Sequence, residues 1–247
     1  MRISTLRGRS IAFLYALSVA GYPLSAGIAG LIGIDESSVP GIVFRALFLL
    51  NSLVVIWFVS IKQRRFASGI YLVPFGIFWG LYLIRMALDT VYAPVHLGRP
   101  GYEYLLFGVG STLIPALAFF THVRDDTIRE AFWLTIILVS GACILNLYAA
   151  IGALAEGNTI TAVRLGQAKL NPISLGHLGA SLVLLSGYGL LQSQLRRQVS
   201  KVRLLGLVVL GVVCAIVAAS RGPILALAAG GGVLYIWLLS EKRYAAF

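Results

Sequence analysis

The chain has 247 residues, of which 59% are hydrophobic and only 12% are charged. A soluble domain carries about twice this share of charged residues, so the composition excludes an ordinary soluble enzyme or binding domain. The net charge of +11 would suit a nucleic-acid-binding protein, but the basic residues form no contiguous face that could follow a phosphate backbone.

Apolar runs of roughly 18–25 residues alternate with short charged segments along the chain, which is typical of helices that cross a lipid bilayer. The sequence therefore predicts an all-α fold, a polytopic transmembrane helix bundle of about eight spans. In chain order, the predicted spans cover residues 10–34, 41–61, 69–92, 102–121, 131–154, 171–192, 204–220 and 222–240. We expect residues 1–247 to form a single integral membrane domain.

The first apolar run follows three arginines and ends among small residues near Ala26, so it has some features of a secretory signal. The run is long, however, and it ends without a clear cleavage site. We therefore expect an uncleaved first span.

Lysine and arginine residues gather in alternate connections. Fourteen of the 20 lie at the two termini and after the second, fourth and sixth spans, whereas the opposite connections hold only Arg99, Arg164 and Lys169. Because positive residues favour the cytoplasmic side, this bias predicts that the N- and C-termini are both cytoplasmic. The opposite side is called the outer face below.

Each span that starts at the outer face has a proline at or just before its start. These prolines are Pro40, Pro100, Pro172 and Pro223. Proline suits the first turn of a helix, where its missing N–H would be unpaired in any case. Asn171 and Ser220 are candidate N-caps of the last two of these spans. Helix initiation alone would account for the prolines.

The cations near these starts need a further reason, because positive residues are disfavoured at the outer face. A helix N-terminus already carries partial positive charge, so an arginine there gains nothing from the helix dipole. A helix N-terminus and a cationic side chain beside it together make a site for an anion such as a phosphate. We therefore expect Arg164, Lys169 and Arg221, near two helix starts, to bind a diphosphate at the outer membrane surface.

Three further cations are candidate contacts to the same anion. Arg85 lies four residues before Asp89, so the two can form an ion pair within the third span, and this structural role is the favoured one. Arg45 lies about one turn inside the second span, where it can extend to the outer surface. Arg99 precedes Pro100 in a connection.

His96 is the only histidine in an outer connection and is the candidate catalytic general base, with a bystander role in the loop as the alternative. We expect His177, within the sixth span, to pack there or to hydrogen-bond a neighbouring helix. The two cysteines, Cys143 and Cys214, fall in apolar runs and are expected to be buried packing residues. The acidic residues are too scattered for a metal site, and the Asp125-Asp126 pair is interpreted as a solvated turn.

Two segments are similar to a known family. Residues 164–176 read Arg-Leu-Gly-Gln-Ala-Lys-Leu-Asn-Pro-Ile-Ser-Leu-Gly, and residues 219–227 read Ala-Ser-Arg-Gly-Pro-Ile-Leu-Ala-Leu. Together they resemble the bacterial O-antigen ligase and O-antigen polymerase superfamily. In that family an arginine precedes an Asn-Pro helix start, and a Ser-Arg-Gly segment opens a later span.

The resemblance implies an inverting, metal-independent glycosyltransferase of the bacterial inner membrane, without a cofactor. The donor would be an undecaprenyl-diphosphate-linked glycan at the periplasmic face. The acceptor would be a sugar hydroxyl of another glycan or of lipid A-core, in lipopolysaccharide or exopolysaccharide assembly. By position, Arg164 and Arg221 would bind the donor diphosphate. Whether the reaction is that of a ligase or of a polymerase stays open.

The resemblance covers only the N-terminal part of the family architecture, which continues through a large periplasmic loop and further spans. We therefore expect a truncated product, a partial sequence or a short member of the family. Two other functions remain open. One is a transporter or flippase for a polysaccharide or lipid-linked substrate, for which Pro74 and Pro115 could interrupt helices. The other is a non-catalytic membrane subunit.

Overall fold

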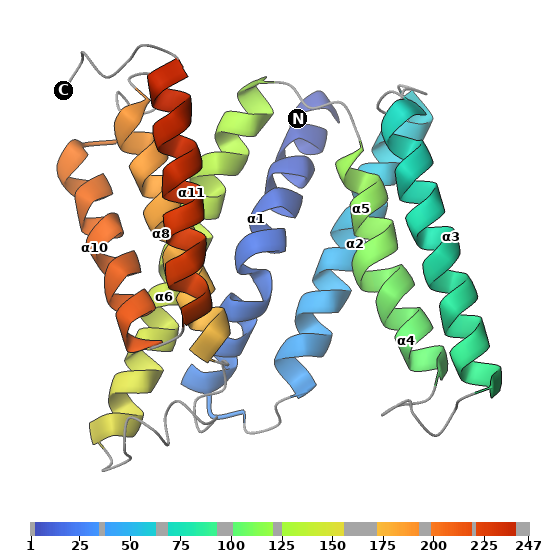
Figure 1. The fold of residues 1–247 in the computed structure, drawn as a ribbon, viewed down its shortest axis with the longest axis horizontal. Helices are drawn as coiled ribbons and strands as arrows, with labels where there is room; N and C mark the ends of the chain where they lie inside the picture. Colours follow the sequence, from blue (N-terminus) through green and yellow to red (C-terminus); the bar gives the residue numbers. More distant parts are fainter. Residues whose placement is uncertain are drawn as a thin grey trace. The chain divides into compact units, whose positions relative to one another are not determined.

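The computed structural model describes residues 3–34, 38–62, 69–92, 101–120, 125–155, 172–192, 199–218 and 221–240. These residues form helices and no strands, which confirms the predicted all-α fold (Figure 1). The helices are α1 (Ile3–Leu31), α2 (Ser38–Lys62), α3 (Gly69–Tyr92), α4 (Gly101–Gly108), the π-helix η2 (Val109–Leu113), α5 (Ile114–Phe119), α6 (Asp125–Ala155), α8 (Pro172–Leu191), α10 (Lys201–Val217) and α11 (Arg221–Ser240).

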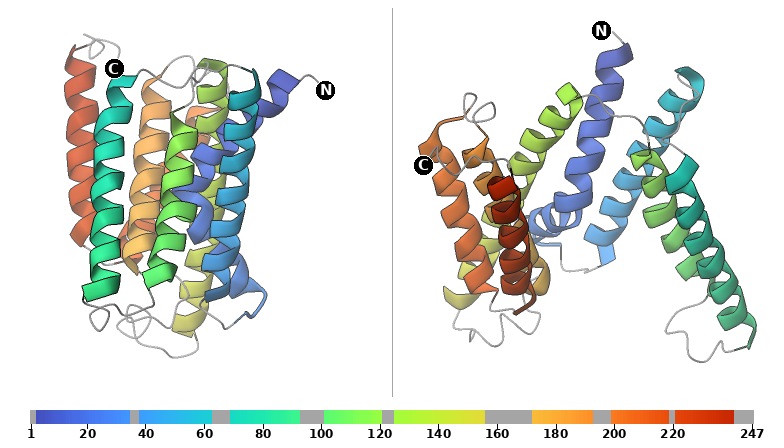
Figure 2. Two further views of the ribbon diagram at one scale, coloured as in Figure 1. Left: turned by 90° about the vertical axis from the view of Figure 1, so that its right-hand side faces the viewer. Right: turned by 45° about the horizontal axis from the view of Figure 1, so that its top comes forward.

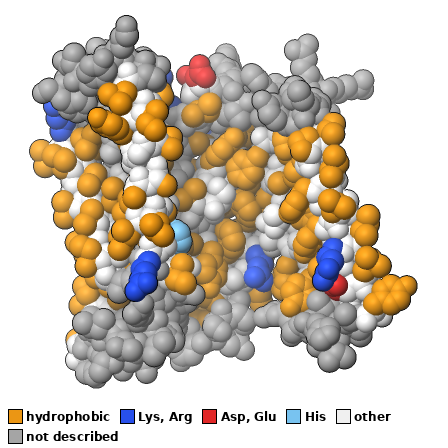
Figure 3. Space-filling model, in the orientation of Figure 1, with side chains coloured by type: hydrophobic (Ala, Val, Ile, Leu, Met, Phe, Trp, Pro, Cys, Tyr) orange, Lys and Arg blue, Asp and Glu red, His pale blue; other side chains and the backbone are white. Residues whose placement is uncertain are grey.

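Six helical segments are long and apolar enough to cross a membrane: Gly8–Leu31, Val39–Phe58, Leu72–Tyr92, Gly101–Phe119, Asp125–Gly152 and Ile173–Leu191. Helices α10, with 17 residues, and α11, with 20, cover the two other predicted spans. Hydrophobic side chains dominate the coloured surface in Figure 3, as expected for helices that face lipid. A membrane protein is thus supported, while the count of eight spans and the cytoplasmic termini remain predictions.

The helix starts agree with the proline pattern of the sequence. Pro40 is the third residue of α2, Pro172 is the first residue of α8, and Pro223 is the third residue of α11. One prediction about a helix start is wrong. Asp125 and Asp126 do not form a separate turn but open α6, where negative charge is stabilised by the N-terminal end of the helix dipole.

The chain divides into two compact units. One contains Met1–Tyr15 and Val43–Ala131, and the other contains Ala16–Ile42 and Phe132–Phe247. In the first unit, α3 packs against α4. The helix that begins with α4 widens after Gly108 into η2, in the turn before Pro115. A proline ring clashes with the carbonyl of the preceding turn, and the wider π-turn relieves the clash.

The second unit has a core of small and aliphatic side chains from α1, α6, α8 and α10. Its buried members are Ala20, Ala26, Val139, Ala142, Cys143, Leu175, Leu178, Leu182, Cys214 and Ala218. The prediction that both cysteines are buried packing residues is therefore confirmed. Small residues at helix contacts let the backbones approach closely, which is the main source of packing energy between helices in lipid.

Glycines set the spacing of α8 and α10. A Cβ atom added at Gly179 would lie 2.5 Å from the carbonyl oxygen of Gly211, and one added at Gly211 would lie 2.7 Å from the carbonyl oxygen of Gly179. At the next contacts along α8, Gly176 meets Ala218 and Gly189 meets Leu204. Residue numbers rise along α8 while they fall along α10, so the two helices are antiparallel (Figure 2).

A buried amide joins α6 to α1. The Nδ2 atom of Asn146 donates hydrogen bonds to the carbonyl oxygens of Pro23, at 2.9 Å, and Ala142, at 2.8 Å. Asn146 is almost completely buried, and polar side chains that bond across helices stabilise such bundles in lipid. A Cβ atom added at Gly27 would lie 3.0 Å from the same Nδ2 atom, so this part of α1 is closely fitted around the amide.

Candidate anion-binding site

The starts of α8 and α11 lie against each other. A Cβ atom added at Gly176 would overlap the Pro223 ring, at 2.4 Å from its Cγ atom, and would lie 3.1 Å from the Cβ atom of Ala218. Pro223 is fully buried in this contact. The first turn of α11 therefore packs on the second turn of α8, and the absence of a side chain at Gly176 makes the contact possible.

The two helices also run in the same direction. Gly176 meets Pro223 near their starts, and eight residues further along α8, Leu184 lies 2.7 Å from the position of a Cβ atom added at Gly230. Parallel packing puts both N-termini at one end of the pair. The two helix starts that carry the Asn-Pro and Ser-Arg-Gly-Pro motifs are thus neighbours in space.

Two basic side chains lie at this shared end. Arg221 is the first residue of α11 and is exposed, and the ring of His177 lies beside the next residue, since a Cβ atom added at Gly222 would be 3.7 Å from its Nε2 atom. Among the residues that the structure describes, none makes an ion pair or a hydrogen bond with either side chain.

This arrangement can bind an anion. A guanidinium offers a planar fork of donors that matches two oxygens of a phosphate. The first N–H groups of a helix have no partner within that helix, and the dipole favours negative charge at that end. Two parallel helix starts therefore bring their first N–H groups, an arginine and a histidine to one end of the helix pair.

The position of His177 near the start of α11 was not predicted from the sequence. We expected it to pack within its span or to bond a neighbouring helix, but its side chain is exposed and lies beside Gly222. The signal in the sequence was its position, only five residues after Pro172, at a helix start that was already suspected of binding an anion.

Six of the residues predicted from the sequence lie outside the described part of the chain. They are Arg164, Lys169, Arg99, His96 and the two candidate caps, Asn171 and Ser220. Their part in the site stays a prediction. Of the predicted cations, Arg221, Arg85 and Arg45 are described, and side-chain contacts place Arg85 and Arg45.

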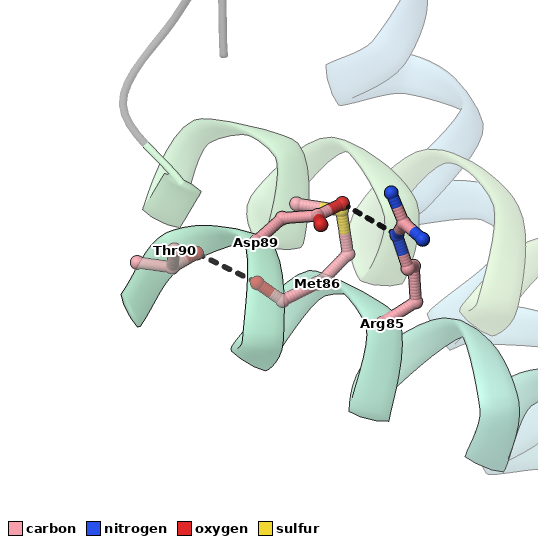
Figure 4. A network of polar contacts seen from close by, with 4 residues as sticks. All are labelled: Arg85, Met86, Asp89 and Thr90. Carbon is pink, nitrogen blue, oxygen red and sulfur yellow. Dashed lines mark hydrogen bonds and ion pairs between the residues drawn. The ribbon is translucent and has the colours of Figure 1, made fainter. Parts of the chain in front are cut away.

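Arg85 and Asp89 form the predicted ion pair. The Nε atom of Arg85 lies 2.8 Å from the Oδ2 atom of Asp89, one turn further along α3, and the Thr90 hydroxyl donates to the carbonyl oxygen of Met86 at 2.7 Å (Figure 4). The pair lowers the cost of both charges within a membrane span. Because its charge is already balanced, Arg85 is a weaker candidate for an anion than Arg221.

Arg45 has an aromatic partner. Its guanidinium carbon lies 4.2 Å from the ring centroid of Phe107, which joins α2 to α4. Such a cation–π contact gains strength when water is excluded. Arg45 thus joins two helices of the first unit, Arg85 is paired within α3 of that unit, and Arg221 belongs to the second unit.

No group of three or more His, Cys, Asp or Glu side chains that could hold a metal ion occurs within the described ranges. Comparison of the chain with models of protein families, with curated proteins and with solved structures found no match.

Proposed function

We propose that the chain is an O-antigen ligase-like membrane glycosyltransferase, or a part of one, which acts on an undecaprenyl-diphosphate-linked glycan at the periplasmic face of the bacterial inner membrane. The observation that supports this best is the contact between the starts of α8 and α11. These two starts carry the segments that resemble the family, although they lie about fifty residues apart in the chain.

Arg221 would bind the diphosphate of the donor. In a transfer to a sugar hydroxyl the diphosphate is the leaving group and gains negative charge as the glycosidic bond breaks. A fixed guanidinium directed at that charge stabilises the transition state more than the ground state, and it does so without a metal ion. His177 would add a second donor, with Arg164 and Lys169 as further phosphate ligands and His96 as the candidate base for the acceptor hydroxyl.

The test is charge removal at the site with a charge-matched control. In a strain that lacks the chromosomal gene, we expect lipid-linked glycan to accumulate, and a plasmid copy of the full chain, with any downstream reading frame that completes it, to reverse this. Arg221→Gln and Arg164→Ala should each abolish the reversal. Arg203→Gln should keep it, because Arg203 is exposed at the start of α10, and this start lies beside the end of α8 rather than beside the start of α8 that carries the site. If both site variants complement fully at normal membrane levels, the proposal fails.

One observation favours the alternative of a carrier for a lipid-linked substrate. The span formed by α4, η2 and α5 is interrupted by a π-helix at residues Val109–Leu113, and interrupted helices are common in transporters. Scrambling of a fluorescent polyprenyl phosphate glycoside in reconstituted vesicles separates the two functions. Fast scrambling that Pro115→Ala abolishes, without any glycosyl transfer, would favour the carrier.

A further inference from the structure

Helix α3 has two different faces. On one face Trp79 and Met86 are buried and Tyr82 meets α4, where a Cβ atom added at Gly108 would lie 2.9 Å from the Tyr82 ring. The other face is exposed, and its residues follow one another in alternating steps of four and three: Pro74, Phe78, Leu81, Arg85, Leu88 and Tyr92. We call this set of residues the α3 seam. Such spacing packs one helix lengthwise against another, in coiled coils and in membranes alike.

An arginine distinguishes the α3 seam from a surface that only faces lipid. The Arg85 side chain is 76% exposed, although Arg85 lies about 10 Å along the helix axis before the last residue of α3. Its Nε atom binds Asp89 (Figure 4), and no other residue that the structure describes makes a hydrogen bond or an ion pair with it. One such bond leaves most of the five N–H donors of a guanidinium unused. Charged side chains within membrane spans almost always face another protein segment rather than lipid.

The charges of the α3 seam fit a second copy of the same seam. Two copies inserted in the same direction hold their Arg85 side chains at one depth and their Asp89 side chains about 6 Å further along. A twofold axis parallel to the helices brings each arginine within reach of the aspartate of the other copy, because every contact in such an interface occurs twice. The resulting ring of two arginines and two aspartates is neutral. A seam with charges of one sign would instead repel its copy.

We propose that two copies of the chain associate through the α3 seam, with Arg85 of each copy bound to Asp89 of the other. Leu81 and Leu88, which precede and follow Arg85 in the seam, pack against the same residues of the second copy and keep lipid away from the charges. This association requires α3 to be a membrane span, which its length and apolar composition support. It does not depend on the transfer reaction.

Oxidative cross-linking of the full chain in membranes locates the contact. Leu81→Cys puts a thiol in the seam, whereas Leu83→Cys puts one on the other side of α3, where Leu83 is also exposed. With copper phenanthroline, Leu81→Cys should give a covalent dimer and Leu83→Cys should not. The unaltered chain measures the background, because Cys143 and Cys214 are buried. Equal cross-linking of the two variants, or none in either, would overturn the proposal.

Charge variants test the reciprocal pairing. Native mass spectrometry of the full chain in detergent measures the dimer at increasing protein concentrations. Arg85→Gln and Asp89→Asn should each weaken the dimer by roughly tenfold or more, because each removes both pairs across the contact. Mixed in equal amounts, the two variants regain one pair, so unlike copies should associate more often than random pairing gives. Random pairing in the mixture, or a monomeric unaltered chain at every concentration, would contradict the proposal.

Two glycines on the other side of α3 offer a rival contact. A Cβ atom added at Gly76 or Gly80 meets nothing within 4 Å, and glycines four residues apart also join helices in membranes. Gly76→Ile should leave the dimer unchanged, because Gly76 lies outside the seam. Loss of the dimer in Gly76→Ile would assign the contact to the glycines and overturn the α3 seam as the interface.

Discussion

The contact between Gly176 and Pro223 offers a quantitative test of how the site is built. In Gly176→Ala the new methyl group would overlap the Pro223 ring and press on Ala218, so the start of α11 must move away from α8. Overpacking of a filled contact costs about 1–3 kcal/mol. Replacing glycine by alanine inside a helix also stabilises that helix by about 0.8–1.0 kcal/mol, which would hide part of the cost.

Gly187→Ala is the matched control for this variant. It lies on the same helix, and a Cβ atom added there meets nothing within 4 Å, so it carries the helix gain without the overlap. We therefore expect Gly176→Ala to be less stable than Gly187→Ala by about 1–3 kcal/mol, or roughly 5- to 150-fold in the unfolding equilibrium constant. Unfolding in mixed micelles with increasing denaturing detergent, followed by circular dichroism, measures the difference. Equal stability of the two variants would refute the packing of α11 on α8.

Three further predictions concern the contacts that hold the helices. Asn146→Leu should destabilise the protein by about 0.6–1.7 kcal/mol, from the mean to the largest value for such bonds in membranes, because it removes both hydrogen bonds of the amide; an unfolding curve that does not move would contradict its role. Arg85→Gln should cost more than the double variant Arg85→Gln/Asp89→Asn, since the single change leaves a carboxylate without its partner in a span, and a double-mutant cycle without coupling energy would speak against the ion pair. Phe107→Leu and Arg45→Gln should each lower the stability by about 0.5–2 kcal/mol, because each removes the same cation–π contact. The double variant should therefore lose less than the sum of the two single losses, and a loss equal to that sum would refute the contact.

The positions of the helices could be predicted from the sequence because hydropathy in a membrane depends on long runs rather than on single contacts. The third predicted span, residues 69–92, has the same bounds as α3. The start of α6 was missed because its first turn is charged, and helices continue past the apolar run when acidic residues suit the N-terminus. The start of α10 at Lys201 was also missed because its first turn is charged and lies before the apolar run. Ser200 caps this turn by accepting a hydrogen bond from the Arg203 N–H at 3.4 Å.

The candidate site was predictable only in part. The prolines and the charge bias pointed to Arg221 at a helix start, which the structure bears out. The place of His177 depends on which face of α8 meets α11, and that is set by the glycine contacts at Gly176 and Gly230. Such contacts join residues far apart in the chain, so neither the periodicity nor the local motif of a single span carries the information.

The central claim is that Arg221, at the joined starts of α8 and α11, binds the diphosphate of a polyprenyl lipid. Titration of the purified protein with undecaprenyl diphosphate, read out by native mass spectrometry, tests it most directly in Arg221→Gln beside Arg203→Gln. Loss of a charge-assisted hydrogen bond of about 1.5–3 kcal/mol predicts that Arg221→Gln binds roughly 10- to 150-fold more weakly, while Arg203→Gln binds as the unaltered protein does. Equal affinities of the two variants would contradict the account.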